Sequence, residues 1–332
     1  MDAIGPTLTA MTQPFSVRVT DPAWRSEAQA WLVAACEADG RVVTGPVEQP
    51  RVRPWSTQLV VPTDAGRVWF KANVAGATHE PAVHRVLSRL APAEVLPPLA
   101  VDAERGWMAM PDHGAVLGDD HDPSEQEWSD VLRGAARLQR KAVAHHDALA
   151  AAGLPECPPA TVPDRLDRLV ATFEALEPAH PTHVDADLAA QLRAARPLVV
   201  DAAARLADGP VPATFQHGDA HPWNVFVEGG RLRLFDFGDA QWAHAVEVLM
   251  VPYGIVRQGG TLDWPSVVEG YRLEWELSHA ELDELMAAAA LTHPVNRALT
   301  WWTSLLEASP AELAEYGDAP LWHLKNVLEP WP

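Results

Sequence analysis

Cysteine is scarce in this sequence, and its scarcity excludes a fold held together by disulfide bonds. Only Cys36 and Cys157 occur among 332 residues, too few for the disulfide framework of a small secreted domain. We expect both to be small buried apolar residues rather than nucleophiles. With 48% hydrophobic residues, a chain of this length can build its core without covalent cross-links.

Long apolar runs and basic clusters are also missing. No stretch approaches the roughly 18 apolar residues of a membrane-spanning helix, and residues 1–12 lack the basic start and apolar centre of an export signal. We therefore expect a soluble, cytoplasmic protein without a membrane partner. A formal net charge of −20 without Lys/Arg clusters argues against nucleic acid as a partner. This charge would suit a cationic substrate, although excess Asp and Glu also simply keep a surface solvated.

Hydrophobic periodicity divides the chain into a strand-rich first part and a helical second part. The first part is expected to hold a helix at 22–39, strands at 57–61 and 67–72, a helix at 81–90, and strands at 99–101 and 106–110. After a polar connector at 111–123, helices are expected at 125–153, 164–177, 185–208, 244–257, 264–276, 279–291 and 295–308. We predict an α+β fold with two lobes, 1–112 (including a helical extension over 1–50) and 113–332, and a cleft between them.

The segment 217–239 interrupts the helical part and carries the most informative pattern. It reads HGDAHPWN at 217–224, then VFVEGGRLRLFDFGD at 225–239. Gly229 and Gly230 stand between two alternating runs, which predicts a hairpin with a two-residue turn. The predicted register pairs Val227 with Leu232 and Val225 with Leu234. It places Asn224 opposite Phe235, one residue before Asp236.

Three oxygen-bearing side chains should therefore meet at one end of this hairpin. Asn224 and Asp236 come together through the register, and Asp219 lies on the turn that leads into the same end. Carboxylate and amide oxygens suit Mg²⁺, which proteins hold with one or two carboxylates plus substrate phosphates. A carboxylate not used by the metal could accept the proton of an attacking hydroxyl. This combination is what phosphoryl transfer requires.

The motif HGDxHxxN, followed about a dozen residues later by DFGD, resembles the aminoglycoside phosphotransferase family of small-molecule kinases, which has a protein-kinase-like fold. The resemblance implies that Asp219 is the catalytic base and that Asn224 and Asp236 bind Mg²⁺. It implies ATP or GTP as phosphoryl donor. The acceptor would be a hydroxyl of a small molecule, such as an aminoglycoside, an amino sugar or an amino alcohol.

Other residues of the motif are expected to support the loop. His217, His221 and Asp239 correspond to positions that brace it by hydrogen bonds. Trp223 stands where the family commonly has a small residue, so it either narrows the acceptor pocket or packs, and we favour packing. Among the tryptophans available to line an acceptor pocket, Trp301 and Trp302 are adjacent on a helix and cannot both face it.

Lys71 ends the predicted strand at 67–72 and resembles the lysine with which the family contacts the α- and β-phosphates. Taken alone, it could equally be a solvent-facing lysine on an edge strand. The resemblance also implies an acidic partner on the following helix. Glu80 is our prediction for that partner, and Glu94 is the alternative because the interval to Glu80 is short.

The remaining nucleotide contacts are predicted from position in the first lobe. No glycine-rich GxGxxG loop precedes Lys71, so we expect Ser56 or Thr57 to contact the phosphates through hydroxyl and backbone N–H groups. The segment 108–113, with Met110 and Asp112, corresponds to a lobe-connecting hinge whose backbone would bind the purine. Backbone contacts leave the choice between ATP and GTP open.

Three other functions compete with a small-molecule kinase. His217, Asp219 and His221 alternate like ligands of a metal-dependent hydrolase, but this leaves Asn224 and Asp236 unexplained. A catalytically weak pseudokinase would lack one of the key groups, and all of them are present. A protein kinase would need a long activation loop after Asp236, for which the sequence has no room. The sequence does not predict the oligomeric state.

Overall fold

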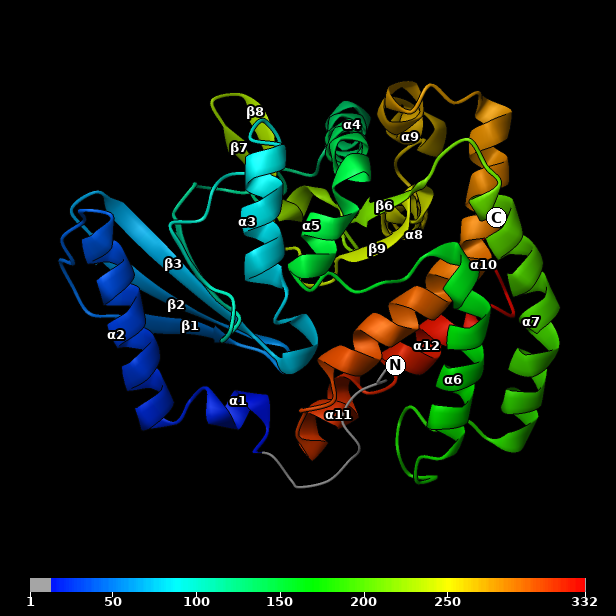
Figure 1. Ribbon diagram of the computed structural model, residues 1–332, viewed down its shortest axis with the longest axis horizontal. Helices are drawn as coiled ribbons and strands as arrows, with labels where there is room; N and C mark the ends of the chain where they lie inside the picture. Colours follow the sequence, from blue (N-terminus) through cyan, green and yellow to red (C-terminus); the bar gives the residue numbers. More distant parts are fainter. Residues whose placement is uncertain (1–12, 332) are drawn as a thin grey trace.

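The computed structural model describes residues 13–331 as two lobes, one built around a sheet and the other mainly from helices (Figure 1). The first lobe contains α1 (Phe15–Arg18), α2 (Pro22–Ala38), β1 (Glu48–Val52), β2 (Ser56–Thr63), β3 (Gly66–Asn73), the 3-10 helix η1 (Ala75–Ala77), α3 (Glu80–Leu90), β4 (Ala100–Asp102) and β5 (Trp107–Pro111). Its five strands pair antiparallel in the order β1-β2-β3-β5-β4. The α+β class predicted from the sequence is confirmed.

Helix α2 begins at a capping residue and covers one face of this sheet. The Asp21 side chain accepts hydrogen bonds from the backbone N–H groups of Ala23 and Trp24, which satisfies donors at the helix start. Leu32 on α2 is buried in one apolar cluster with side chains of β2, β3 and β5. The helix expected at 22–39 and the two hairpins of the first lobe are therefore confirmed, whereas β1 was not predicted.

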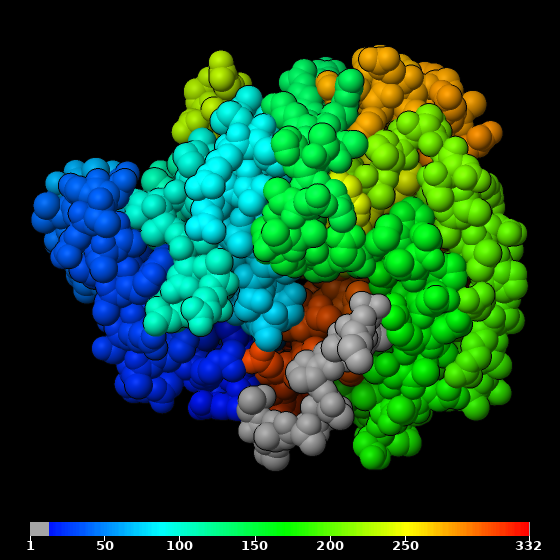
Figure 2. Space-filling model, viewed as in Figure 1, coloured from blue at the N-terminus to red at the C-terminus, as the bar shows by residue number. Residues whose placement is uncertain are grey.

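The second lobe is mostly helical, with two short two-stranded sheets. It contains α4 (Glu125–Ala142), η2 (Val143–His145), α5 (His146–Ala151), η3 (Pro159–Thr161), α6 (Val162–Glu174), α7 (Ala186–Ala207), β6 (Ala213–Gln216), η4 (Pro222–Asn224), β7 (Val225–Glu228), β8 (Arg231–Leu234), β9 (Gln241–His244), η5 (Ala245–Leu249), α8 (Met250–Gly259), α9 (Trp264–Glu274), α10 (His279–Ser304), α11 (Pro310–Tyr316) and α12 (Ala319–Lys325). In the space-filling view the two lobes lie against each other (Figure 2).

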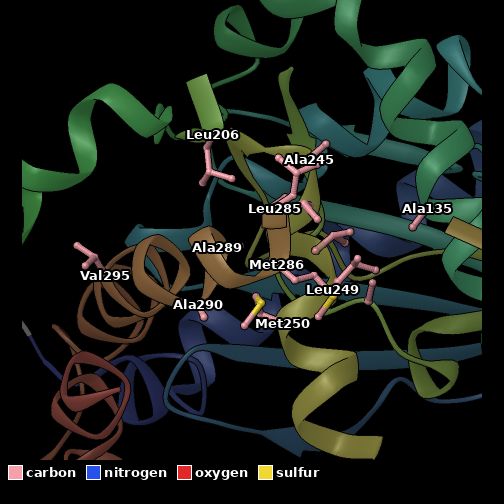
Figure 3. Packing of buried hydrophobic residues seen from close by; sticks show 14 of the residues in the cluster. Ala135, Leu206, Ala245, Leu249, Met250, Leu285, Met286, Ala289, Ala290 and Val295 are labelled. Carbon is pink, nitrogen blue, oxygen red and sulfur yellow. The ribbon is translucent and has the colours of Figure 1, made fainter. Parts of the chain in front are cut away.

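Helix α10 runs through the centre of this lobe as one element, where the sequence predicted two helices separated near Pro294. Proline inside a helix removes a hydrogen bond and costs about 3 kcal/mol. Here every residue from Ala288 to Ala298 is buried, and Figure 3 shows Met286 and Ala290 packed together with Met250. Burial on this scale outweighs the cost of the proline, so the prediction of a break was wrong.

Two expectations about composition can be compared with the structure. Cys36 and Cys157 are both buried and unpaired, as expected. Burial raises the pKa of the Cys157 thiol to about 11, so the thiolate form is disfavoured. Among the described residues, no helix combines the length and the apolar character that a membrane crossing requires.

Candidate active site

The loop that joins β6 to β7 holds Asp219 in a fixed position. Gly218 has φ 84°, a conformation that favours glycine, and a Cβ there would overlap the backbone carbonyl of Asp239. Nε2 of His217 lies 3.0 Å from the carbonyl oxygen of Phe235. His217 therefore ties the loop to the segment after β8, which is the bracing role predicted for it.

Asp219 sits among hydrogen-bond donors and positive charge. Its Oδ2 lies 3.3 Å from Nε2 of His221, and its Oδ1 lies 3.7 Å from Nη2 of Arg297. Nδ2 of Asn224 donates to the Asp219 backbone carbonyl at 2.9 Å. Burial alone would raise the pKa of Asp219, but the His221 hydrogen bond and the Arg297 charge outweigh it, so the pKa lies below its ordinary value. The carboxylate is therefore ionised at neutral pH.

The hairpin β7–β8 has the predicted register. Val225 pairs with Leu234 and Val227 with Leu232, and both turn glycines have positive φ. The N–H of Phe235 donates to the carbonyl oxygen of Asn224 at 3.1 Å. Asn224 thus lies beside the residue that precedes Asp236, and both side chains border one cavity.

Asp236 adopts φ 66°, which is uncommon for a residue with a Cβ and which proteins retain mainly at functional positions. Its Oδ1 accepts a bond from Nζ of Lys71 at 2.7 Å. Burial would raise the pKa of Asp236, but the charge and hydrogen bond of Lys71 outweigh it and lower the pKa. Asp236 is thus held as a carboxylate.

Lys71 also pairs with Glu80, the partner predicted from the sequence. Its Nζ lies 2.7 Å from Oε2 of Glu80. Glu80 is 1% exposed and accepts further bonds from Asn73 at 2.6 Å and from the N–H of Phe237 at 3.2 Å. Burial would lower the pKa of Lys71, but the charges of Asp236 and Glu80 raise it. Glu94, the alternative, pairs with Lys141 instead.

A cavity of about 660 Å³ between the lobes, here called the interlobe cavity, gathers most of the predicted side chains. Lys71, Glu80, Met110, Asp112, Asn224 and Asp236 all line it. Its volume falls within the range of about 300–1,000 Å³ that is usual for small-molecule sites. A smaller adjoining space, the Asp219 cavity, is bordered by Asp219 and shares Lys71 and Asp236 with the interlobe cavity.

Ser56 and Thr57, the two predicted phosphate contacts, lie in different surroundings. Ser56 borders the Asp219 cavity. Thr57 is fully buried, and its hydroxyl donates to the carbonyl of Arg51 and accepts from Gln49, both at 2.9 Å. The Thr57 hydroxyl is therefore occupied within the sheet. It does not line either cavity, because neighbouring residues of a strand point to opposite faces.

Trp223 both packs and borders the interlobe cavity. Its Nε1 donates to the carbonyl oxygen of Gly118 at 3.1 Å, and its ring meets Trp128 edge-on. The predicted packing is present. The Trp223 side chain lines the interlobe cavity together with Asn224 and Phe226, and it does not line the Asp219 cavity. It therefore does not narrow the space beside Asp219.

Two arginines at the site were missed by the sequence analysis. Arg51 on β1 lines both cavities, and its Nε has no hydrogen-bond partner among the described residues. Arg297 on α10 is 8% exposed and pairs with both Asp219 and Asp239. Asp239 thus braces the loop as predicted. A single basic residue in a strand or a helix carries no motif, so no sequence signal identified either arginine.

Comparison with known proteins identifies the family. The model of the phosphotransferase enzyme family, known as APH, matches residues 63–285, which is more than half of the chain. The chain belongs to this family. No curated protein sequence matches the chain.

Solved structures resemble this family member along most of its length. A macrolide 2'-phosphotransferase type I has a TM-score of 0.58 at 16% identity, covering 90% of this chain and 98% of its own. A choline kinase from Streptococcus pneumoniae has a TM-score of 0.56 at 14% identity, with coverages of 90% and 99%. A spectinomycin phosphotransferase, solved with ADP and spectinomycin, has a TM-score of 0.53 at 14% identity, with coverages of 91% and 94%. The predicted two-lobed, protein-kinase-like fold is confirmed.

The family match bears on the competing functions. A phosphotransferase is supported, and among residues 13–331 no group of three His, Cys, Asp or Glu side chains is arranged to hold a metal ion. The hydrolase alternative through His217, Asp219 and His221 therefore lacks a donor set. His221 instead lies beside Asp219 and Asn224 as a bracing group.

Proposed function

We propose that this phosphotransferase moves the γ-phosphoryl group of ATP or GTP, with Mg²⁺, onto a hydroxyl of a small molecule. One observation carries the proposal: Lys71 and Asp236 border both the interlobe cavity and the Asp219 cavity. A nucleotide in the first space would therefore direct its terminal phosphate toward the second, where Asp219 stands.

Nucleotide binding is assigned to the interlobe cavity. Lys71, oriented by Glu80, and Arg51 supply positive charge for the phosphates, and Ser56 supplies a hydroxyl. Segment 108–113, which includes Met110 and Asp112, borders the same cavity and would bind the base through its backbone. In this proposal residues 1–112 act as the nucleotide lobe, and 113–332 carry the catalytic loop and the acceptor site.

Asn224 and Asp236 would hold Mg²⁺, because an amide oxygen and a carboxylate are hard donors of the kind this ion prefers. Nδ2 of Asn224 is engaged by Asp219, so its Oδ1 is the atom available to a ligand. When bound, the ion would neutralise charge on the phosphates during transfer.

Asp219 would orient the acceptor hydroxyl and take its proton. The acceptor oxygen forms a bond to the γ-phosphorus while the bond from that phosphorus to the β–γ bridging oxygen breaks, releasing the nucleoside diphosphate. The proton passes from the hydroxyl to a carboxylate oxygen of Asp219. The lowered pKa keeps this carboxylate ionised and able to accept a hydrogen bond at neutral pH.

Calorimetric titration with ATP and Mg²⁺ tests the nucleotide part of the proposal. Asp236→Ala should weaken metal-dependent ATP binding by at least about 10-fold, because it removes a proposed ligand and the partner of Lys71. Asp130→Ala, which removes a carboxylate paired with Arg133 on the surface of α4, is the matched control. Unchanged affinity of the Asp236 variant with Mg²⁺ present would contradict the proposal.

A further inference from the structure

A third cavity, open to solvent on one side, lies in the second lobe and is bordered by a residue that contacts Asp219. It has a volume of about 180 Å³ and lies between α8, α10 and α12, with Met250, Ala290, Pro294, Arg297, Trp301 and Trp322 among its lining residues. We refer to it as the C-lobe cavity. Arg297 forms part of its wall, and Nη2 of Arg297 lies 3.7 Å from Oδ1 of Asp219. A single guanidinium group therefore separates this cavity from the proposed base.

An aromatic pair links the lining of the C-lobe cavity to that of the Asp219 cavity. The ring of Trp301 meets that of Trp55 edge-on, with centroids 5.6 Å apart, and Trp55 borders the Asp219 cavity. A molecule seated against Trp301 would thus lie one aromatic ring, that of Trp55, away from the Asp219 cavity.

The lining favours an uncharged occupant. Among the described residues that line the C-lobe cavity, none is Asp or Glu. The Trp301 ring is already engaged by a cation and an aromatic ring, because the Arg297 guanidinium lies 5.7 Å from its centroid and the His323 ring stacks on it. Conversely, Asp219 and Asp239 lie just beyond Arg297, so an anion would meet their negative charge.

Buried hydrogen-bond donors at the cavity have no partners. Nε1 of Trp301 and Nε of Arg297 are both buried without a hydrogen-bond partner among residues 13–331, as is Nε2 of His293. Each unsatisfied buried group costs about 1–3 kcal/mol. Trp Nε1–H and Arg Nε–H can only donate, so an accepting oxygen of an occupant that reached them would satisfy them, whereas an ammonium group would not.

We propose that the C-lobe cavity binds the phosphoryl acceptor, and that this acceptor is a compact, uncharged alcohol with an aromatic or alicyclic body and a second oxygen that accepts hydrogen bonds. The inference rests on the proposed function. The volume is close to the roughly 150 Å³ of a cavity that holds benzene and below the roughly 300 Å³ where drug-sized sites begin. A body of about one ring therefore fills the cavity, whereas most of a multi-ring aminoglycoside would lie outside it.

Acceptor-dependent ADP release from ATP and Mg²⁺ tests this inference. The probes are 2-phenoxyethanol and 4-methoxybenzyl alcohol, each with one ring, one hydroxyl and one ether oxygen, against choline and kanamycin. The neutral alcohols should stimulate ADP release at least about 10-fold over a reaction without acceptor, and the cations should not. Faster turnover of choline or kanamycin, or no response to the neutral alcohols, would overturn the inference.

A substitution at the opening of the cavity locates the binding site. Gln258 lines the cavity and is exposed, so Gln258→Trp should obstruct it and raise the KM of the neutral alcohols at least about 10-fold. Arg257→Trp places the same side chain on the neighbouring exposed position, which is not part of the lining, and should leave that KM unchanged. Equal KM values in the two variants would overturn the placement.

Calorimetric titration of wild-type protein with ATP and Mg²⁺ distinguishes a failure of the acceptor inference from a failure of the proposed function. If wild-type protein binds ATP–Mg²⁺ in the calorimeter but does not use the neutral alcohols, the acceptor inference fails and the nucleotide site stands. If wild-type protein does not bind ATP–Mg²⁺, the proposed function fails and the inference falls with it.

Discussion

Each charged side chain of the candidate site is held in place by hydrogen bonds and ion pairs with its neighbours. Glu80 and Asp236 hold the ammonium group of Lys71 in place, at 2.7 Å from each, where the proposal has it bind phosphate. Glu80 is in turn fixed by Asn73 and by the backbone N–H of Phe237. These groups are therefore held in place without a bound nucleotide, which is the preorganisation that electrostatic catalysis requires.

Substitution of Arg51 is a simple test of whether the interlobe cavity binds the nucleotide. The Arg51→Ala variant should raise the KM for ATP about 10-fold, because an arginine that borders both cavities would lose its contact with the phosphates. Arg53→Ala, which removes the same charge from an exposed position two residues away, is the control for net charge. Steady-state kinetics with varied ATP measure the effect, and equal KM values in the two variants would remove Arg51 from the site.

The site residues were predictable from the sequence where a local motif or a register brings them together. Asn224 and Asp236 could be paired because two glycines define the turn and hence every cross-strand neighbour. Arg51 and Arg297 could not, because each reaches the site from a separate element through tertiary packing alone. The sequence offered Ser56 and Thr57 equally as phosphate contacts, and the alternation of the strand places only Ser56 at the Asp219 cavity.

At the scale of elements, a buried polar network ties η5 to α10 and α6. Glu247 in η5 accepts bonds from Thr292 at 2.7 Å and from Asn296 at 2.8 Å, and Asn296 in turn accepts from Arg165 of α6 at 2.7 Å. These bonds join α10 to its neighbours close to Pro294. They help to explain why the helix continues through a residue that the sequence marks as a break.

Glu247 should make the stability of the fold depend on pH. Burial raises its pKa to about 7, more than its bonds to Thr292 and Asn296 lower it. The native state then binds a proton more tightly than the unfolded chain, so stability is highest below the unfolded pKa of about 4.5 and falls as pH rises through about 7. Glu247→Gln should flatten this fall, which amounts to at most roughly 3 kcal/mol.

Urea unfolding at a series of pH values between 4.5 and 8 measures that dependence. Glu284→Gln makes the same change on the exposed surface of α10 and should follow the wild-type curve. If the Glu247 variant followed the wild-type curve as well, the buried carboxyl would not be the group responsible.

At the scale of the whole molecule, the lobes meet beside the Asp219 cavity. Trp55 of the first lobe contacts Trp301 and Tyr316 of the second, with ring centroids 5.6 and 5.2 Å apart. Glu307 accepts a bond from the N–H of Ala75 at 3.1 Å and pairs with Arg18 at 2.7 Å. The first lobe is thus anchored on the same side of the molecule as Asp219 and the C-lobe cavity.

The two-lobed architecture was predictable because strand-like and helical periodicity occupy separate parts of the chain. How the lobes sit against each other was not, since contacts such as those of Trp55 and Glu307 join residues far apart in sequence and carry no local pattern. The C-lobe cavity, the proposed acceptor site, is lined by residues of α8, α10 and α12, which only packing of the second lobe brings together. It therefore became visible only in the folded molecule.

The central claim is that Asp219 receives the acceptor proton beside a nucleotide held by Lys71 and Asp236, and Asp219→Ala tests it most directly. Transfer, measured as ADP release with the best acceptor of the probe panel, should fall by about 10³-fold or more. ATP–Mg²⁺ affinity measured by calorimetry should stay within about 3-fold of wild type, because Asp219 borders the adjoining cavity and not the interlobe cavity. Turnover at the wild-type rate in this variant would contradict the account.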